Sequence, residues 1–269
     1  MSTKSVRWMF NFTKWSPTMS DMLLASSCIQ KEEKERLSRF VFKKDLKASL
    51  IGRLMARKYV SQSTGKKYDQ IKLIRDERGR PLVEDDPSVQ FNISHQGDFT
   101  VFAGEFGDLM LGIDVMKLEY TGGRDLNEFF RIMNRQFSPE EWQEIKRAGD
   151  RNEQEKMFCR HWCLKESYTK AMGLGVTATL QEKFKINTKR LSMVDIVDDT
   201  ELLLKGEKMD WAIQEMLIDE EHCVALTTNK KVDKVIFREI TFEELMQDCV
   251  PLGPPDEHFA RDYFNKRDK

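Results

Sequence analysis

Residues 162–170, Trp-Cys-Leu-Lys-Glu-Ser-Tyr-Thr-Lys, hold the strongest concentration of side chains that could do chemistry. On a helix, Trp162, Glu166 and Lys170 would recur every four residues and lie on one stripe. The carboxylate could bind a metal ion or accept a proton, and the ammonium one turn away could neutralise a phosphate. The same spacing is typical of an exposed Glu–Lys pair, which stabilises a helix by roughly a few tenths of a kcal/mol.

A second carboxylate, Asp114, ends the apolar run Leu-Gly-Ile at 111–113. The run is typical of a strand. A carboxylate at a strand end suits Mg²⁺, which prefers carboxylate and phosphate oxygens in proteins. An Asp that caps the next segment or forms a turn is the equally ordinary alternative.

Polar residues also gather at the end of the strand-like run 91–94, where His95 and Gln96 follow Asn-Ile-Ser. This position favours a binding site, although a lone histidine is more often structural. A basic turn at 75–80, Arg-Asp-Glu-Arg-Gly-Arg, and Arg36 upstream could wrap a phosphate through guanidinium and backbone N–H groups. Such a turn is also typical of a solvated surface loop.

In chain order, these clusters resemble the signature of one enzyme family. Gly-Ile-Asp at 112–114, about fifty residues before Trp-x-x-Lys-Glu-Ser-x-x-Lys at 162–170, resembles the two motifs of the 4′-phosphopantetheinyl transferase superfamily. Asn-Ile-Ser-His at 92–95 matches its larger, Sfp-type members. The strings at 31–37 and 52–58 are similar to the animal members of that type. None of these motifs is specific alone, but their combination in this order is.

The resemblance runs from about Val6 to Thr227 and implies both a fold and a reaction. The fold is α+β, with two similar α/β-type lobes in a pseudo-two-fold arrangement and an active site between them. In the reaction, a serine hydroxyl of an apo acyl or peptidyl carrier protein attacks the β-phosphate of coenzyme A. Phosphopantetheine moves to the serine and adenosine 3′,5′-bisphosphate leaves. The carrier domains implied are those of fatty-acid synthase and of the aminoadipate-semialdehyde dehydrogenase type.

The same resemblance implies a role for each matching residue. Asp114 and Glu166 would ligate Mg²⁺, and Glu166 would also take the proton of the serine hydroxyl. Lys170, assisted by Lys165, would neutralise the phosphates, and His95 would contact one of them. The residues implied in coenzyme A binding are Arg36, Arg75, Asp76, Glu77, Arg78, Gly79, Arg80, Asn92, Ile93, Ser94 and His95, with Glu166 and Lys170.

One position departs from the family's pattern. Many bacterial relatives carry a third acidic metal ligand two residues after the Asp, where this chain has Met116. A thioether is a poor ligand for Mg²⁺. We therefore expect either water or the side-chain oxygen of Gln96 to complete the metal shell. The alternative is that Met116 packs in the core and Gln96 belongs only to a hairpin.

The main competing function is a non-catalytic module that binds coenzyme A or a carrier protein. The presence of Asp114, Glu166 and Lys170 together argues against it, since binding alone needs no base. The sequence contains neither the P-loop pattern nor the dinucleotide-binding fingerprint of other nucleotide-binding enzymes.

Hydrophobic periodicity predicts the elements that position these residues. Residues 32–62 should form two helices divided near 43–45, with Asp45 as the N-cap of the second. Another helix should begin with a capping box of Ser138 and Glu141, with Pro139 at its first position, and a further one should span 155–172. The predicted strands are 71–75, 91–94, 99–104, 110–115, 184–186, 201–204, 211–216 and 223–227. The order helix-then-sheet thus occurs twice.

These elements predict two lobes and an extension. We expect an N-terminal lobe over 1–118, a linker at Thr-Gly-Gly-Arg, 121–124, and a C-terminal lobe over 124–230. An extension would follow over 231–269. Its part from Pro251 onward should be partly extended or disordered.

The composition is that of an ordinary globular protein. The 269 residues carry 44 Lys+Arg and 45 Asp+Glu, a net charge of −1, so global electrostatics give no reason to expect nucleic-acid binding. No apolar run approaches the roughly 18 residues of a membrane span. Five scattered cysteines without a secretory signal predict reduced thiols in a cytosolic protein, and Cys159, His161 and Cys163 lack a second ligand pair for zinc. We expect a monomer.

Overall fold

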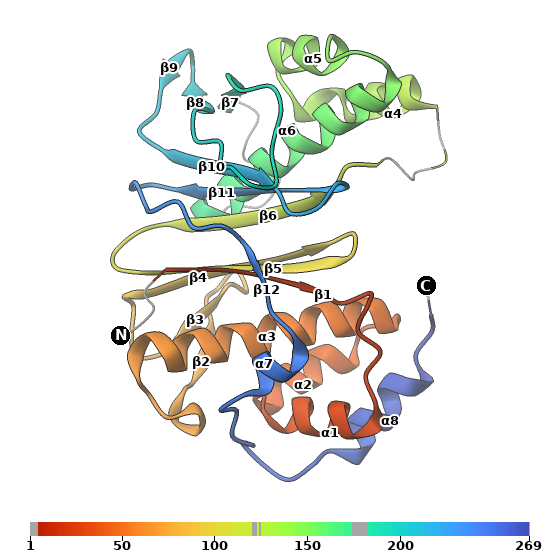
Figure 1. Cartoon of the computed structure of the whole chain (residues 1–269), viewed down its shortest axis with the longest axis vertical. Helices are drawn as coiled ribbons and strands as arrows, with labels where there is room; N and C mark the ends of the chain where they lie inside the picture. The colour runs from red at the N-terminus through yellow and green to blue at the C-terminus, as the bar shows by residue number, and fades with distance from the viewer. Residues whose placement is uncertain (1–4, 120–122, 124, 174–181, 269) are drawn as a thin grey trace. The chain divides into compact units, whose positions relative to one another are not determined.

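The structure is a computed structural model that describes residues 5–119, 123, 125–173 and 182–268. The chain forms two compact units, drawn in Figure 1. Unit 1 contains Met1–Asp108 together with Phe237–Lys269, and unit 2 contains Leu109–Ile236. The α+β fold predicted from the sequence is confirmed, since each unit combines helices with small sheets. In the described ranges, no helix is long and apolar enough to cross a membrane.

Unit 1 is a mostly antiparallel sheet with helices on one face. Its strands are β1 (Val6–Asn11), β2 (Leu73–Arg75), β3 (Pro81–Val83), β4 (Val89–Gln96), β5 (Phe99–Phe106) and β12 (Arg238–Glu239). Its helices are α1 (Met19–Ser27), α2 (Lys31–Ser38), α3 (Lys43–Thr64), the 3-10 helix η1 (Tyr68–Gln70), α7 (Phe242–Met246) and α8 (Glu257–Asn265). The sheet order is β12-β1-β5-β4, and β2 pairs with β3 in a separate hairpin.

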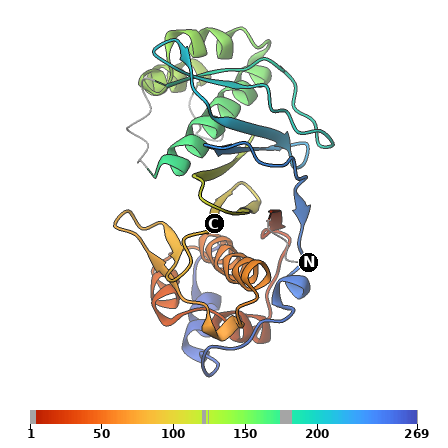
Figure 2. The same ribbon diagram turned by 90° about the vertical axis from the view of Figure 1, so that its left-hand side faces the viewer.

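The long helix α3 forms the core of unit 1 by packing on β4 and β5, with α1, α2 and α8 around it (Figures 1 and 2). Tyr59 of α3 and Trp8 of β1 both pack on Phe102 of β5, with ring centroids 5.4 and 5.5 Å apart. Because aromatic side chains bury large areas, this cluster fixes α3 on the sheet. It thereby fixes the direction of every side chain that α3 presents.

Unit 2 packs one long helix against a three-stranded sheet. Its helices are α4 (Leu126–Ile132), the 3-10 helix η2 (Met133–Gln136), α5 (Pro139–Lys146) and α6 (Arg151–Met172). Its strands are β6 (Leu111–Lys117), β7 (Glu182–Lys185), β8 (Glu201–Leu204), β9 (Glu207–Lys208), β10 (Ala212–Leu217) and β11 (His222–Thr228). The antiparallel sheet β10-β11-β6 lies under α6, and β7-β8-β9 form a second sheet. An aromatic cluster joins α4 and α5 to α6.

Most predicted elements are present. The capping box of Ser138 and Glu141 is formed, and α6 ends at Met172, as predicted, with Gly173 as a left-handed C-cap. The predicted N-cap at Asp45 is wrong, because α3 begins at Lys43 after Phe42. The backbone N–H of Lys43 instead donates to the carbonyl of Arg267, 2.9 Å away, so the helix start needs no side-chain cap.

The compact units differ from the predicted lobes in two places. Strand β6 pairs with β11 in unit 2, so the division falls after Asp108 rather than after residue 118. The segment from Phe237 onward folds into unit 1, where β12 pairs in parallel with β1. The prediction of a partly extended tail missed α8, whose Phe259 and Tyr263 are buried in the core of unit 1. Most of the predicted linker lies outside the described residues.

Candidate active site

The first candidate site lies within unit 2, where α6 crosses β6. Helix α6 carries Glu166 and Lys170 on one stripe, and β6 carries Asp114 on the face toward the helix. The Nζ atom of Lys170 lies 2.6 Å from Oδ1 of Asp114, which is 5% exposed. The structure therefore brings together the three residues that the sequence places about fifty positions apart.

Gly112 makes this approach sterically allowed. A Cβ atom built on Gly112 would lie 2.1 Å from the carbonyl oxygen of Ser167 and 2.2 Å from the backbone nitrogen of Ala171. Both are backbone atoms of α6, so a rotamer change could not relieve the overlap. The glycine of the Gly-Ile-Asp motif thus lets the helix backbone touch the strand two residues before Asp114.

The electrostatics of the site favour a cation between two carboxylates. Burial raises the pKa of Glu166, the charge of Asp114 raises it further, and Lys170 opposes both effects. A divalent cation bound by both carboxylates would offset the electrostatic repulsion between them. Within the described ranges, no third Asp, Glu, His or Cys joins them in a metal-binding group.

Lys165 does not lie with the predicted phosphate-binding residues. It is buried and pairs with Glu141 of α5 at 3.1 Å, above the rings of Phe137 and Phe184. Glu141 also accepts the backbone N–H of Phe184 at 3.0 Å, so this ion pair ties α5 and β7 to α6. The prediction that Lys165 assists at the phosphates therefore has a structural alternative, in which it anchors α6 to α5.

Met116 packs against the hydrophobic clusters under α6. This placement agrees with the core-packing alternative for that position. Asp114 and Met116 lie on the same face of β6, as strand alternation requires. The two carboxylates predicted to hold Mg²⁺ therefore lie on α6 and β6, and the third ligand stays a prediction.

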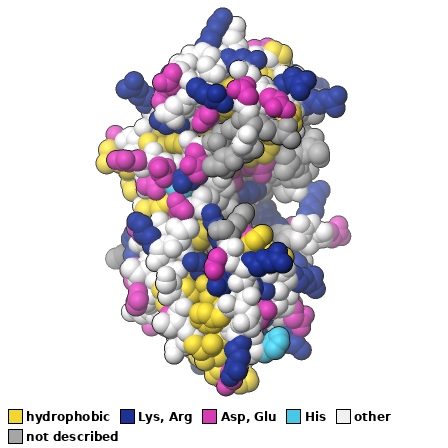
Figure 3. All heavy atoms as spheres, turned by 90° about the vertical axis from the view of Figure 1, so that its right-hand side faces the viewer, with side chains coloured by type: hydrophobic (Ala, Val, Ile, Leu, Met, Phe, Trp, Pro, Cys, Tyr) yellow, Lys and Arg dark blue, Asp and Glu magenta, His cyan; other side chains and the backbone are white. Residues whose placement is uncertain are grey.

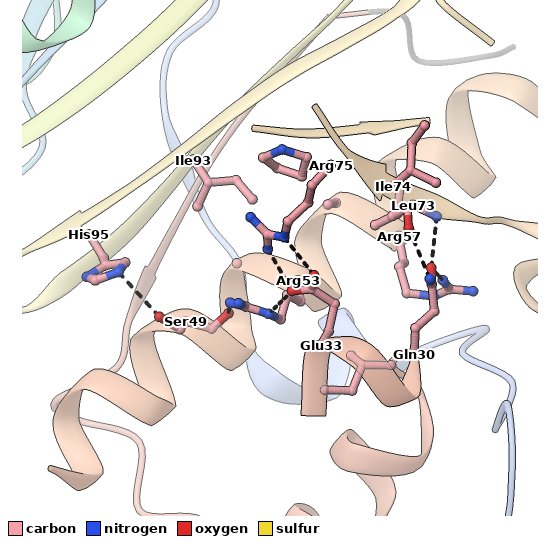
Figure 4. A pocket seen from close by; sticks show the side chains of 14 residues that line it. Gln30, Glu33, Ser49, Arg53, Arg57, Leu73, Ile74, Arg75, Ile93 and His95 are labelled. Atoms are coloured by element: carbon pink, nitrogen blue, oxygen red, sulfur yellow. Dashed lines mark hydrogen bonds and ion pairs between the residues drawn. The ribbon is translucent and has the colours of Figure 1, made fainter. Parts of the chain in front are cut away.

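The second candidate site is a pocket within unit 1, seen from close by in Figure 4. Its volume is about 220 Å³. Pockets that enclose a whole drug-sized ligand hold roughly 300–1,000 Å³, so this one fits one end of a larger molecule. Its lining residues come from α2, α3, β2, β3 and β4 and the segment before α2. Its polar members are Gln30, Glu33, Ser49, Arg53, Arg57, Arg75 and His95.

A shared carboxylate holds two of the arginines in place. Glu33 accepts from Nε of Arg53 at 2.5 Å and from Nη2 and Nε of Arg75 at 2.7 and 2.8 Å (Figure 4). Burial alone would raise the pKa of Glu33, but the bonds and charges of Arg75 and Arg53 hold it below its ordinary value. The carboxylate shows that this pocket can hold an anion between two guanidinium groups.

The pocket includes some predicted residues and excludes others. Ile93 and His95 of β4 line it, and Nε2 of His95 lies 3.4 Å from Oγ of Ser49. By strand alternation, Asn92 and Ser94 point to the other face of β4, where both are buried. Of residues 92–95, which were expected to share one pocket, Ile93 and His95 line it and Asn92 and Ser94 do not. Gln96 is the last residue of β4, before the two-residue turn to β5.

The basic turn has a more structural role than the sequence suggests. Asp76 accepts from the backbone N–H groups of Arg78 and Arg80 at 3.0 and 2.8 Å, so it organises the turn. Gly79 has φ +83°, which that turn requires. Of this segment, Arg75 is the residue that lines the pocket, and Glu77 is exposed. Arg36 is 51% exposed and lies 3.9 Å from Glu33, and it is not among the described lining residues.

Sequence reasoning missed Arg53, Arg57 and Glu33. Arg57 is 1% exposed and donates to the carbonyls of Tyr68 and Ile71, at 2.5 and 3.1 Å. A signal was available, because both arginines fall in the string at 52–58 that carries the resemblance.

Comparisons with known proteins agree with this geometry. A family model described as 4′-phosphopantetheinyl transferase, N-terminal, matches residues 13–107, and one described as 4′-phosphopantetheinyl transferase superfamily matches residues 110–227. The break between the two matches falls where the two units divide, after Asp108. Each unit therefore has its own family match.

Individual relatives span nearly the whole chain. The L-aminoadipate-semialdehyde dehydrogenase-phosphopantetheinyl transferase of Mus musculus is 38% identical over 280 residues, which covers 96% of this chain and 90% of the relative. The protein of the same name from Homo sapiens is 39% identical with the same coverage. The 4′-phosphopantetheinyl transferase Sfp of Bacillus subtilis is 30% identical over 170 residues, 63% of this chain and 71% of the relative.

Proposed function

The chain belongs to the 4′-phosphopantetheinyl transferase superfamily, and from that premise we propose how its residues divide the work. It is an enzyme that transfers phosphopantetheine from coenzyme A to carrier-protein domains. The family and reaction expected from the motifs are thereby confirmed, and a non-catalytic binding module is not favoured. The single observation that carries the residue assignments is the convergence of Asp114, Glu166 and Lys170 where α6 meets β6.

Glu166 is the proposed base for the serine hydroxyl, directly or through one water. Its raised pKa suits this role, because a base accepts a proton best when its pKa lies nearer the working pH. Asp114 maintains that pKa through its charge. Lys170 supplies a positive charge for the phosphate oxygens, where charge stabilisation is the main contribution a protein makes to phosphoryl transfer.

Asp114 and Glu166 would also hold a Mg²⁺ ion. Their fit rests on the donor set, hard oxygens of two carboxylates. Burial raises the pKa of Glu166, and the charge of Asp114 raises it further. Bound Mg²⁺ would neutralise and orient the pyrophosphate of coenzyme A. Water or Gln96 would complete its shell, as expected from the sequence.

Unit 1 would bind the nucleotide end of coenzyme A. The 3′-phosphate would lie against Arg75 and Arg53, which already hold a carboxylate, and His95 would contact a phosphate from the rim of the same pocket. Arg36 and the turn at 76–80 would extend this basic region. Asn92 and Ser94 would support the site from within β4.

The carrier domains are proposed by analogy with the animal relatives, whose names include L-aminoadipate-semialdehyde dehydrogenase. Carriers of the fatty-acid synthase type are the second class expected. We also propose a cytosolic monomer. The five free cysteines are compatible with a reducing compartment.

A mass-shift assay tests the function. The protein would be incubated with an apo carrier domain, coenzyme A and Mg²⁺, and the carrier would gain the mass of phosphopantetheine. Glu166→Gln should slow this gain by at least ~10²-fold, the usual contribution of a general base. Glu153→Gln, an exposed change in the first turn of the same helix, is the matched control. Near-normal turnover of Glu166→Gln at saturating Mg²⁺ would exclude Glu166 as both base and ligand.

A further inference from the structure

Two cysteines far apart in the sequence meet in unit 1. Cys28 follows α1 and is fully buried, and Cys249 follows α7 and is partly exposed. Their thiols lie close enough to interact. The backbone confirms the approach of the two segments, because the N–H of Leu252 donates to the carbonyl of Ser27 at 2.7 Å. Both cysteines pack in or against the same hydrophobic core.

Polar and cationic groups surround this pair. The hydroxyl of Tyr68 donates to the carbonyl of Cys28 at 3.0 Å. Nζ of Lys58 donates to the carbonyl of Gln247 at 3.0 Å, two residues before Cys249. The guanidinium of Arg57 lies 4.7 Å from the centre of the Tyr68 ring. Both cations are largely buried, so water screens their charges weakly.

This environment makes the two thiols unequal. Hydrogen bonding to Cys28 lowers the pKa of Cys249 to about 7, and Tyr68, Lys58 and Arg57 contribute in the same direction against the effect of burial. The interaction with Cys249 and burial both raise the pKa of Cys28. Cys249 is therefore the member of the pair that loses its proton more readily near neutral pH. A low-pKa, accessible cysteine next to a second cysteine is the arrangement of reversible thiol oxidation sites.

We propose that Cys249 is a peroxide-reactive thiol and that Cys28 resolves its oxidised form to an intramolecular disulfide. The Cys249 thiolate attacks one oxygen of hydrogen peroxide, the O–O bond breaks, and with one proton a sulfenic acid and water form. The Cys28 sulfur then attacks the Cys249 sulfur, and its thiol proton leaves with the hydroxyl group as a second water. Two thiols are oxidised by two electrons and one peroxide is reduced. A dithiol reductant reverses the bond.

Cys249 is the more accessible residue of the pair, since it is partly exposed whereas Cys28 is fully buried. A surface pocket of about 730 Å³ is lined by Ser27 and Leu252, which lie one and three residues from the two cysteines. The disulfide would fix the segment after α7 to the end of α1. Gln30, two residues beyond Cys28, accepts from the N–H of Leu73 at 2.8 Å and lines the arginine pocket. Oxidation would therefore act next to the proposed nucleotide site within unit 1.

Peptide mapping of the full-length protein tests the proposal. The reduced protein would be treated with hydrogen peroxide at pH 7, quenched with an alkylating reagent, digested and analysed by mass spectrometry. We expect a peptide pair linked through Cys28 and Cys249, lost after treatment with a dithiol. Cys28→Ser should instead leave a sulfenic acid on Cys249 that dimedone traps. Cys159→Ser, a cysteine whose pKa burial raises, is the control that should retain the linked pair.

Alkylation of the native protein without peroxide gives a second, independent readout. Cys249 should react with iodoacetamide faster than the buried Cys159, Cys163 and Cys223, and the disulfide form should have a higher Tm than the reduced form. The proposal is overturned if Cys249 reacts no faster than the buried cysteines. It is equally overturned if peroxide yields no linked pair, or if Cys28→Ser gives no dimedone adduct on Cys249.

Discussion

Lys170 on α6 and Asp114 on β6 form a 2.6 Å ion pair, and this pair links the two family motifs to each other. The carboxylate is almost fully buried, whereas the lysine side chain is 28% exposed. The ammonium therefore stabilises a charge that would otherwise be costly to bury, and it still reaches the surface where a phosphate would arrive.

The two lysines of the motif should respond differently to removal of their charge. Lys170→Met should lower turnover by at least ~10²-fold, the scale for losing one stabilising donor. Lys165→Met should lower the free energy of unfolding by about 3–5 kcal/mol, since Glu141 would remain buried without its cation. Turnover assays and urea unfolding measure the two effects. Loss of turnover in Lys165→Met with unchanged stability would show that Lys165 acts at the phosphates after all.

The arginine pocket predicts a specific defect in substrate binding. Arg75→Ala and Arg53→Ala should each raise the KM for coenzyme A by roughly ten- to 150-fold, the value of about 1.5–3 kcal/mol for a lost charge-assisted hydrogen bond. For dephospho-coenzyme A, which lacks the 3′-phosphate, the same substitutions should raise the KM much less. Arg36→Ala tests whether that exposed cation also reaches the ligand, with exposed Arg39→Ala as its control. If the parent enzyme uses both coenzymes equally well, the 3′-phosphate does not bind these arginines.

Gly112→Ala should separate α6 from β6. The added Cβ would overlap backbone atoms of Ser167 and Ala171, so the variant should lose about 1–3 kcal/mol of stability or more, together with most of its turnover. Gly253→Ala provides the control, because its Cβ meets open space. Thermal unfolding and the mass-shift assay measure the two effects. Full activity of Gly112→Ala would mean that the contact does not set the catalytic geometry.

The carboxylate between the arginines predicts a dependence of stability on pH. The pKa of Glu33 in the folded protein lies below its ordinary 4.5. The contribution of ionised Glu33 to the free energy of unfolding is therefore complete above pH 4.5. It is lost as the pH falls through the pKa that Glu33 has in the folded protein. Glu33→Gln should lower the free energy of unfolding at pH 7 by about 1–3 kcal/mol and flatten its decline in acid. Exposed Glu32→Gln on the same helix should do neither. This role would be contradicted if the free energy of unfolding fell by the same amount in the parent and in Glu33→Gln between pH 7 and 3.5.

The third metal ligand can be tested by charge. Gln96→Glu should lower the Mg²⁺ concentration needed for half activity, because hard cations bind a charged oxygen more tightly. Met116→Glu should instead destabilise the fold, since its side chain packs in the clusters under α6. Mg²⁺ titrations of both variants distinguish these outcomes. An unchanged midpoint in a folded Gln96→Glu protein would leave water as the third ligand.

The residues that sequence analysis placed correctly share a local pattern. Glu166 and Lys170 are four residues apart on a helix, so their common stripe follows from periodicity alone. Lys165 is adjacent to Glu166 and hence about 100° around the helix, which turns it toward the core and Glu141. The motif alone does not show that Lys165 pairs with Glu141 whereas Lys170 pairs with Asp114, because both partners lie far away in the sequence.

Features that depend on long-range packing were not visible. Strand β1 is buried on both faces, so it lacks the alternation by which a half-buried strand is recognised. In the sequence, Arg53 and Arg57 are typical of the solvent-facing side of an amphipathic helix. In the fold, both line a pocket together with residues of β2 and α2. Local periodicity predicts that a segment is helical or extended. It does not identify the distant segment that packs against it in the fold. On the face drawn in Figure 3, basic and acidic side chains are interspersed.

The pairing of β12 with β1 has a consequence for the order in which the protein can be made. Trp8 and Met9 of β1 pair with Arg238 and Glu239 of β12. Phe259 of α8 is buried in the same hydrophobic core as Trp8. During synthesis, unit 2 leaves the ribosome while unit 1 still lacks β12, α7 and α8. One edge of β1 therefore stays unpaired until β12 has been translated. A chaperone that binds exposed edge strands would recognise the nascent chain until β12 pairs with β1.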